Sequence, residues 1–307
     1  MDIFLQQIIN GLVQGSIYAL VALGYTMVYG IMGLINFAHG EVVMIGTLIT
    51  ISVTGLLIKA GLPAMFAGLI GLGCAVPACM ALGWGLERIA YRPLRNAPRL
   101  TPLITAIGMS IILQNLAMMI WGRNYLTFPQ FLPKIDFELG GANFTAIQVI
   151  IVLVSATTMA GLLMLVYRTR LGMAMRATAQ SPAVASLMGV NVNRVIAAAF
   201  MIGSALGALA GVMVGAYYEV AHYQMGFMLG LKAFTAAVLG GIGNLAGAMA
   251  GGILLGIIEA LGAGYIGDLT NGFLGSHYQD IFAFVVLIIV LMFKPSGLFG
   301  EKTGDRA

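Results

Sequence analysis

Charged residues are scarce in this 307-residue chain: Asp, Glu, Lys and Arg together make up 8% of it, and it has only three histidines. An average soluble domain is nearer a quarter charged, and 60% of this chain is hydrophobic, so a water-soluble fold is excluded. The two cysteines, Cys74 and Cys79, lie in one apolar run. They provide neither a disulfide framework nor a metal-ligand spacing, and we expect small buried side chains there.

Motifs for catalysis and for nucleotide binding are also missing. The histidines His39, His222 and His277 are widely separated, and the chain has neither the His-Glu-x-x-His pattern of zinc hydrolases nor the Gly-x-Ser-x-Gly turn of serine hydrolases. The stretch 300–303 lacks the glycine that precedes lysine in a phosphate-binding loop. We therefore expect a protein that is not an enzyme, holds no cofactor or metal, and does not hydrolyse ATP itself.

Apolar runs of about 20 residues fill the rest of the chain, and each is long enough to cross a bilayer as a helix. A membrane barrel would instead show short alternating segments, and the sequence has none. The fold class is therefore all-α, a polytopic helical membrane protein with about eight transmembrane segments. A shorter apolar piece at 231–239 would pair with the segment after it as two crossings or as a re-entrant hairpin. The expected spans are 4–29, 41–58, 62–86, 101–121, 146–167, 195–217, 245–261 and 281–293.

Basic residues predict the orientation of these spans. Of the fifteen Lys and Arg residues, four lie in 88–99, four in 168–194 and three in 294–306. Connections rich in Lys and Arg remain on the cytoplasmic side of the membrane. These three connections are therefore expected in the cytoplasm, and counting the spans back from them places the N-terminus outside.

Two glycine-rich breaks interrupt the apolar spans and resemble each other. The first break covers residues 30–40 and the second begins at 240. Paired interrupted segments in two halves of a transporter indicate a substrate path, so the chain carries a possible internal repeat; chance similarity among its 42 glycines is the alternative. The shared positions are Gly33, Asn36 and Ala38 in the first break and Gly241, Asn244 and Ala246 in the second.

Polar residues at these breaks are the candidates for a translocation path. A charged side chain within an apolar span is costly and is therefore informative about function. The alternative for the charged members is that they tie broken helix ends together. The candidate path residues are Asn36, His39, Glu41, Asn244 and Glu259.

Residues 168–194 form a long polar interruption between two apolar spans. Ser181 and Pro182 fit the N-cap and first position of a helix. Gly189 fits the left-handed residue that ends one. A short helix on a polar cytoplasmic loop is suited to being held by another protein. Its apolar face would consist of Val184, Leu187 and Met188, spaced i, i+3 and i+4.

A resemblance to a known family joins these patterns. The cytoplasmic loop resembles the glycine-and-alanine loop of ABC-importer permeases, although Met175 stands where that loop usually has an acidic residue. Three stretches closely resemble the permease subunit of branched-chain amino-acid importers, and the likeness covers essentially the whole chain. They are GYTMVYGIMGLINFAHGEVVMIG (24–46), FTAAVLGGIGNLAGAMAGG (234–252) and KPSGLFG (294–300). The residues that match the loop are Gly172, Arg176, Ala177, Ala179, Ala185, Gly189 and Val190.

The resemblance implies one transmembrane permease domain over 1–307, with 168–194 as its cytoplasmic coupling loop. It implies two cytoplasmic ATP-binding subunits, which would bind the ATP, and a second, homologous permease that forms a heterodimer with this chain. A periplasmic amino-acid-binding protein would deliver substrate to this multi-pass protein of the bacterial inner membrane, whose further partner is membrane lipid and not nucleic acid. The 172–190 helix would couple to the ATPases through Gly172, Arg176, Ala177, Ala179, Val184, Ala185, Leu187, Met188 and Gly189.

The expected function is therefore that of a permease in an ATP-driven importer of branched-chain amino acids. Related permeases for urea and short amides share much of the same pattern and form one alternative. A second alternative is an ion-coupled secondary transporter, which should show a relay of intramembrane carboxylates. Glu41 and Glu259 are the only deep candidates for such a relay.

Overall fold

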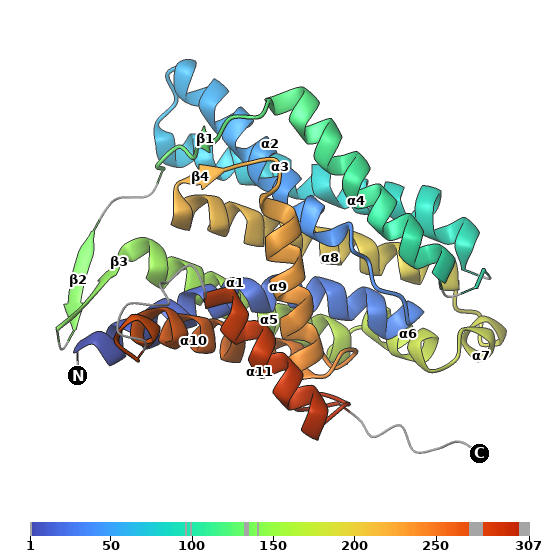
Figure 1. Ribbon diagram of the computed structural model, residues 1–307. Coiled ribbons are helices and arrows are strands. Elements are labelled where there is room, and N and C mark those ends of the chain that lie inside the picture. The colour runs from blue at the N-terminus through green and yellow to red at the C-terminus, as the bar shows by residue number, and fades with distance from the viewer. Residues whose placement is uncertain are drawn as a thin grey trace. The chain divides into compact units, whose positions relative to one another are not determined.

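The structure is a computed structural model and describes residues 2–95, 97–98, 100–131, 135–139, 141–269 and 279–300 (Figure 1). Its long helices are α1 (Asp2–Met32), α2 (His39–Lys59), α3 (Ala64–Leu86), α4 (Leu100–Trp121), α5 (Ala146–Arg168), α8 (Val192–Tyr218) and α10 (Leu245–Leu269). Its shorter helices are the π-helix η1 (Glu87–Tyr91), the 3-10 helix η2 (Arg92–Leu94), α6 (Arg170–Gln180), α7 (Pro182–Leu187), α9 (Met225–Gly240) and α11 (Gln279–Phe293).

Among the described residues, four short strands form two antiparallel ribbons. The first pairs Leu126 with Ala221, and the second pairs Asp136 with Thr145. The strands of the first ribbon are β1 (Leu126–Thr127) and β4 (Val220–Ala221), and those of the second are β2 (Asp136–Leu139) and β3 (Ala142–Thr145).

Within the described residues, seven helices are long and apolar enough to cross a membrane, which confirms the prediction of a polytopic helical membrane protein. The apolar helix α9 has 16 residues and begins at Met225, six residues before the predicted start. It is about 24 Å long, whereas the hydrocarbon core of a bilayer is about 30 Å thick. The choice between two crossings and a re-entrant hairpin in this region therefore stays a prediction.

The chain packs into two compact units, and each unit is built from segments distant in sequence. Unit 1 comprises Met1–Thr26, Lys134–Met159 and Lys232–Ala307. Unit 2 comprises Met27–Pro133 and Ala160–Leu231. The boundaries fall inside α1, α5 and α9, so the predicted spans do not correspond one by one to packing units.

In unit 1, small residues let α1 and α10 approach backbone to backbone. A Cβ added to Gly15 would lie 2.7 Å from the Cα of Ile253, and one added to Gly252 would lie 2.5 Å from the Cα of Ala19. Small residues spaced four apart are the usual means by which membrane helices pack closely, because lipid provides no hydrophobic force between them.

Replacing Gly15 by alanine should therefore destabilise unit 1 by about 1–3 kcal/mol, because the added methyl group meets backbone atoms that cannot move aside. The control is Gly108→Ala in α4, where an added Cβ has no neighbour within 4 Å. That change should be neutral or should stabilise the helix by up to about 1 kcal/mol. Thermal unfolding of the two purified variants in detergent measures the difference, and equal midpoints would contradict the packing argument.

Unit 2 is built on α2, α3 and α8. A Cβ added to Gly46 of α2 would lie 2.8 Å from the Cα of Ala208 in α8, so these two helices also touch through small residues. Cys79 of α3 is buried beside them, with its sulfur 3.6 Å from the carbonyl oxygen of Val42. Cys79 is therefore buried as expected, but Cys74 of the same helix is exposed, so the prediction of two buried cysteines is wrong for Cys74.

Candidate functional site: the coupling segment and the helix breaks

The coupling segment, residues 168–194, begins with α6, a helix that the sequence patterns did not separate from α7. The Thr169 hydroxyl caps α6 by accepting a hydrogen bond from the Gly172 N–H at 3.1 Å. Gly172 is buried against the carbonyl oxygens of Leu165 and Val166, and a Cβ would collide with both. Glycine at this position therefore lets α6 turn back tightly against the end of α5.

Helix α7 has the caps that the sequence predicted. Ser181 accepts from the Val184 N–H at 3.4 Å and Pro182 is the first helical residue. At the other end Gly189 has φ +83°, and the N–H groups of Gly189 and Val190 donate to the carbonyls of Ser186 and Ala185 at 3.0 Å each. This pair of bonds is the Schellman arrangement that closes a helix with a left-handed glycine.

The expected 172–190 helix is therefore two helices in the structure, α6 and α7. Ser181 is extended, with φ −158° and ψ 105°, and divides α6 from α7. The physical reason is local: Pro182 disfavours the α conformation at the residue before it, so α6 ends at Gln180.

The three residues predicted to share the apolar face of α7 are exposed in the structure. Val184, Leu187 and Met188 are 57%, 87% and 80% exposed, whereas Ala185 is 3% exposed and anchors the helix. On α6, Arg176 and Ala179 are exposed and Ala177 is half-buried; the Arg176 guanidinium lies 5.4 Å from the centre of the Tyr167 ring. Large apolar side chains exposed together on a polar segment mark an interaction surface.

The first break is narrower than expected, because α1 continues to Met32 and α2 begins at His39. Gly33 has φ +64° and starts the irregular stretch. Asn36 is 3% exposed and holds this stretch at two points: its carbonyl accepts from the His39 N–H at 3.0 Å, and its Oδ1 accepts from the Tyr91 hydroxyl at 2.8 Å. The break is therefore attached to η1.

Glu41, at 0% exposure, is the most deeply buried carboxyl group near the first break. Its Oε1 accepts from Ser110 at 2.9 Å and from Gln114 at 2.7 Å, both on α4. Its Oε2 has no hydrogen-bond partner among the described residues. His39 is 1% exposed, and its ring lies beside Gly207 of α8. Asn36, His39 and Glu41 thus contact three different elements, η1, α8 and α4.

The second break lies in unit 1, where Asn244 caps α10. Gly241 and Gly243 have φ +105° and +98°. The Asn244 Oδ1 accepts from the Gly247 N–H at 3.1 Å, and its Nδ2 donates to the Phe299 carbonyl at 3.0 Å. The Phe299 N–H in turn donates to the Gly240 carbonyl at 2.9 Å. Two of the stretches that carry the family resemblance, 234–252 and 294–300, therefore hold each other in place.

The two breaks share a glycine with positive φ but not side-chain roles. Gly33 and Gly241 both have positive φ, and an asparagine follows each of them three residues later. Asn36 binds a tyrosine hydroxyl, whereas Asn244 caps a helix. The similarity at these breaks is therefore limited, in the structure, to a positive φ three residues before an asparagine.

Glu259 pairs with a residue that the sequence patterns passed over. Its Oε2 accepts from the Tyr18 hydroxyl at 2.7 Å and lies 3.2 Å from the Lys232 ammonium, with Glu259 1% exposed. Asn244 is fifteen residues earlier beside the same helix, which places it about 22 Å away. Unit 1 therefore does not bring its two candidate path residues together.

The partners that the sequence patterns missed had detectable signals. Lys232 is a lone cation in the apolar piece 231–239, where a charge needs a partner. Ser110 and Gln114 are four residues apart in an otherwise apolar span and so lie on one helix face. Within the part of the chain that the structure describes, no three His, Cys, Asp or Glu side chains gather as a metal site.

Comparisons with known proteins identify the family of this chain. Residues 7–291 match the family described as branched-chain amino acid transport system / permease component. The chain is 46% identical over 309 residues to the high-affinity branched-chain amino acid transport system permease protein BraD of Pseudomonas aeruginosa. This match covers 99% of this chain and 98% of BraD. It is 45% identical over 312 residues to the corresponding protein LivH of Escherichia coli, with coverage of 99% and 97%. Identity to the ribose import permease protein RbsC of Escherichia coli is 25% over 294 residues, with coverage of 94% and 85%.

Proposed function

This chain belongs to the family of branched-chain amino acid transport permease components, and on that premise we propose that it is the permease subunit of an ATP-driven importer of leucine, isoleucine or valine. The observation that carries the substrate class is the identity of about 45% over 99% of the chain to permeases named for branched-chain amino acids. The ribose permease shares much less of the sequence at 25%. We include the urea and short-amide alternative among the substrates to be tested.

ATP would be bound by partner subunits, and α7 supports that assignment. The helix presents Val184, Leu187 and Met188 outward and is closed at both ends by its own caps. A capped helix with an exposed apolar face fits a groove on another protein. We assign three of the other coupling residues to holding this helix: Gly172 and Gly189 by backbone geometry, and Ala185 by burial.

The translocation path would involve the polar groups at the two breaks and Glu259, which lies within α10. In unit 2 these are Asn36, His39 and Glu41, and in unit 1 they are Asn244 and Glu259. Amino and carboxyl groups of the substrate could meet the backbone groups that the irregular stretches leave outside helices. The proposed assembly further contains a second permease, two ATP-binding subunits and a periplasmic amino-acid-binding protein.

Reconstitution of this chain in vesicles tests the function. The chain is combined with a candidate second permease, candidate ATP-binding subunits and a candidate binding protein. Uptake of labelled leucine, urea and acetamide is then measured with and without ATP. We expect leucine uptake that requires ATP, and leucine, isoleucine and valine should compete for it. Uptake of urea in place of leucine would assign the chain to the urea and short-amide class. Leucine uptake driven by an ion gradient without the ATP-binding subunits would overturn the proposal.

Leu187→Asp should weaken binding of the ATP-binding subunits by about thirtyfold, because loss of a central apolar anchor costs about 2 kcal/mol at an interface. Leu187 is 87% exposed, so the charge does not disturb the fold of the permease itself. Binding of the purified ATP-binding subunits to the permease in lipid nanodiscs gives the affinity.

The matched control is Ser186→Asp, which adds the same charge to the same helix. Ser186 is exposed and lies about 150° around the helix from the centre of the apolar face. Its affinity should stay within a factor of a few of the wild-type value. Equal weakening by both changes would show that charge, and not the apolar face, decides binding.

A further inference from the structure

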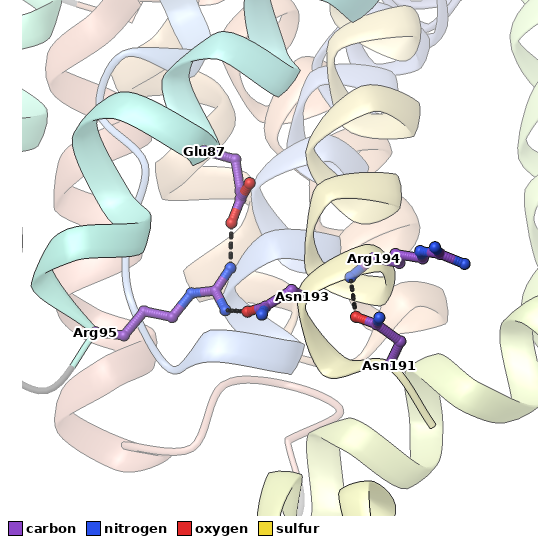
Figure 2. A network of polar contacts seen from close by, with 5 residues as sticks. All are labelled: Glu87, Arg95, Asn191, Asn193 and Arg194. Atoms are coloured by element: carbon purple, nitrogen blue, oxygen red, sulfur yellow. Dashed lines mark hydrogen bonds and ion pairs between the residues drawn. The ribbon is translucent and has the colours of Figure 1, made fainter. Parts of the chain in front are cut away.

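Three side chains from separate parts of unit 2 meet at Arg95 (Figure 2). Arg95 follows η2, forms an ion pair with Glu87, and donates through Nη1 to the Asn193 Oδ1 at 2.6 Å. The side chains of Glu87 and Arg95 are only 2% and 18% exposed. Because a charge this buried cannot be left without its partner at low cost, the pair fixes the relative positions of the elements that carry it.

Asn193 belongs to the end of the coupling segment. It lies in the first turn of α8, two residues after Asn191, whose Oδ1 caps that helix by accepting from the Arg194 N–H at 3.1 Å (Figure 2). Only Val190 separates Asn191 from Gly189, the left-handed residue that ends α7. With so short a connection, capped on both sides, a displacement of α7 is carried to the first turn of α8 and so to Asn193.

Glu87 belongs to the element that holds the first break. Glu87 is the first residue of η1 and Tyr91 is the last, and the Arg92 N–H donates a hydrogen bond to the Glu87 carbonyl. Tyr91 is 1% exposed, its hydroxyl donates to Asn36 at 2.8 Å, and its ring packs 5.1 Å from the ring of Phe200. Single π-helical turns of this kind are frequent at functional sites.

Space beside this arrangement would allow the break to move. A cavity of about 570 Å³ is lined by Gly33, Leu34 and Ile35 of the break, by Arg95, and by Leu100 and Leu103 of α4, among others. The Arg95 Nε is buried without a hydrogen-bond partner among the described residues. The guanidinium therefore has an unused donor next to the stretch of chain that would rearrange.

We propose that the Glu87–Arg95–Asn193 bridge is the link by which movement of the coupling segment reaches the first break. Arg95 and Asn193 are positioning residues in this proposal: they touch neither substrate nor nucleotide, and they act through Tyr91 and Asn36. The proposal rests on the proposed function, because it needs α7 to be the element that the ATP-binding subunits move. The order of the link is α7, Asn193, Arg95, Glu87 with η1, and then Tyr91 on Asn36.

Asn193→Ala tests the link in the full reconstituted importer, with the number of leucine molecules taken up per ATP hydrolysed as the readout. We expect that ratio to fall about tenfold while hydrolysis itself is retained, because α7 and its docking face are unchanged. Asn193→Asp keeps an oxygen acceptor for Arg95 and should restore the ratio. The control is Arg88→Met, which removes the basic residue next to Glu87 in η1. Arg88 is exposed, its guanidinium lies 5.1 Å from the centre of the Trp84 ring, and it takes no part in the bridge. It should leave the ratio unchanged.

Tyr91→Phe removes only the hydroxyl that reaches Asn36, and it tests the other end of the link. If both residues act in one chain of contacts, Asn193→Ala and Tyr91→Phe together should lower the ratio no further than either change alone. Multiplication of the two effects would overturn the proposal, as would a wild-type ratio in Asn193→Ala or an equal loss in Asn193→Ala and Asn193→Asp.

Amide hydrogen exchange of the permease alone separates this proposal from the proposed function. Asn193→Ala should speed exchange of the His39 amide, which is bonded to Asn36, by about tenfold relative to the wild type, and Arg88→Met should not. If the wild-type chain shows no ATP-driven leucine uptake, the proposed function has failed, and the exchange result alone then decides whether the bridge holds the break. An unchanged exchange rate in Asn193→Ala would overturn the link.

Discussion

Gly189→Val is expected to reduce ATP-driven uptake by at least tenfold while leaving the protein folded and inserted in the membrane. Gly189 has φ +83°, a conformation that costs an L-residue about 1–2 kcal/mol and a β-branched one more. The N–H groups of Gly189 and Val190 close α7 on Ser186 and Ala185, and these bonds depend on that conformation. Because α7 has only six residues, losing its C-terminal closure displaces the docking face.

Gly189→Asn is the matched control, because asparagine tolerates the left-handed conformation far better than valine. A Cβ at this position has no neighbour within 4 Å, so the size of the side chain is not the cause of the expected loss. Uptake by Gly189→Asn should therefore lie close to that of the wild type. Transport of leucine and hydrolysis of ATP are measured for both variants in the same vesicles, and full coupled uptake by Gly189→Val would remove α7 from the coupling mechanism.

Lys232→Met should lower the free energy of unfolding by about 3–5 kcal/mol, because it leaves the Glu259 carboxylate buried without its cation. Glu259 is 1% exposed and the Lys232 side chain 12%, so solvent screens this pair little. Tyr18 remains as a donor to the carboxylate at 2.7 Å, but a neutral hydroxyl does not replace a charge. Unfolding of the purified variant in detergent, followed by helicity, measures the loss.

The double variant Lys232→Met/Glu259→Gln should recover most of that stability. Both charges are then removed together, and the amide at position 259 still accepts a hydrogen bond from Tyr18. Replacing a buried ion pair by neutral groups is often close to neutral, whereas removing one partner is not. A double variant as unstable as Lys232→Met would show that the pair acts through packing and not through charge.

Local features of this protein were predictable from sequence because neighbouring residues determine them. Ser181, Pro182 and Gly189 identified both ends of α7, since capping and a left-handed closing residue depend on backbone groups within a few positions. Apolar runs identified the membrane class in the same way, because crossing a bilayer needs only enough consecutive apolar residues. Helical spacing alone predicted that Val184, Leu187 and Met188 share one face, and the structure shows that this face is exposed.

The candidate path residues show where local patterns stop being sufficient. The sequence identified Glu41 and Glu259 as unusual but assigned neither a partner. Glu41 meets two neutral donors from α4, whereas Glu259 meets Lys232 and Tyr18, which is 241 residues away. The same residue type is therefore in an uncharged surrounding in one unit and in an ion pair in the other.

Only the tertiary structure decided these pairings and the meeting of Glu87, Arg95 and Asn193. Asn36 and Tyr91 are 55 residues apart, and Arg95 and Asn193 are 98 apart. No spacing rule connects such positions, because they become neighbours only when several helices pack. The sequence by itself determined the membrane class, the family and the two ends of α7, each of which depends on local backbone chemistry or on resemblance along the chain. The pairing of the buried polar groups depends on helix packing, because a buried donor or charge is satisfied by the partner that the packed helices place beside it.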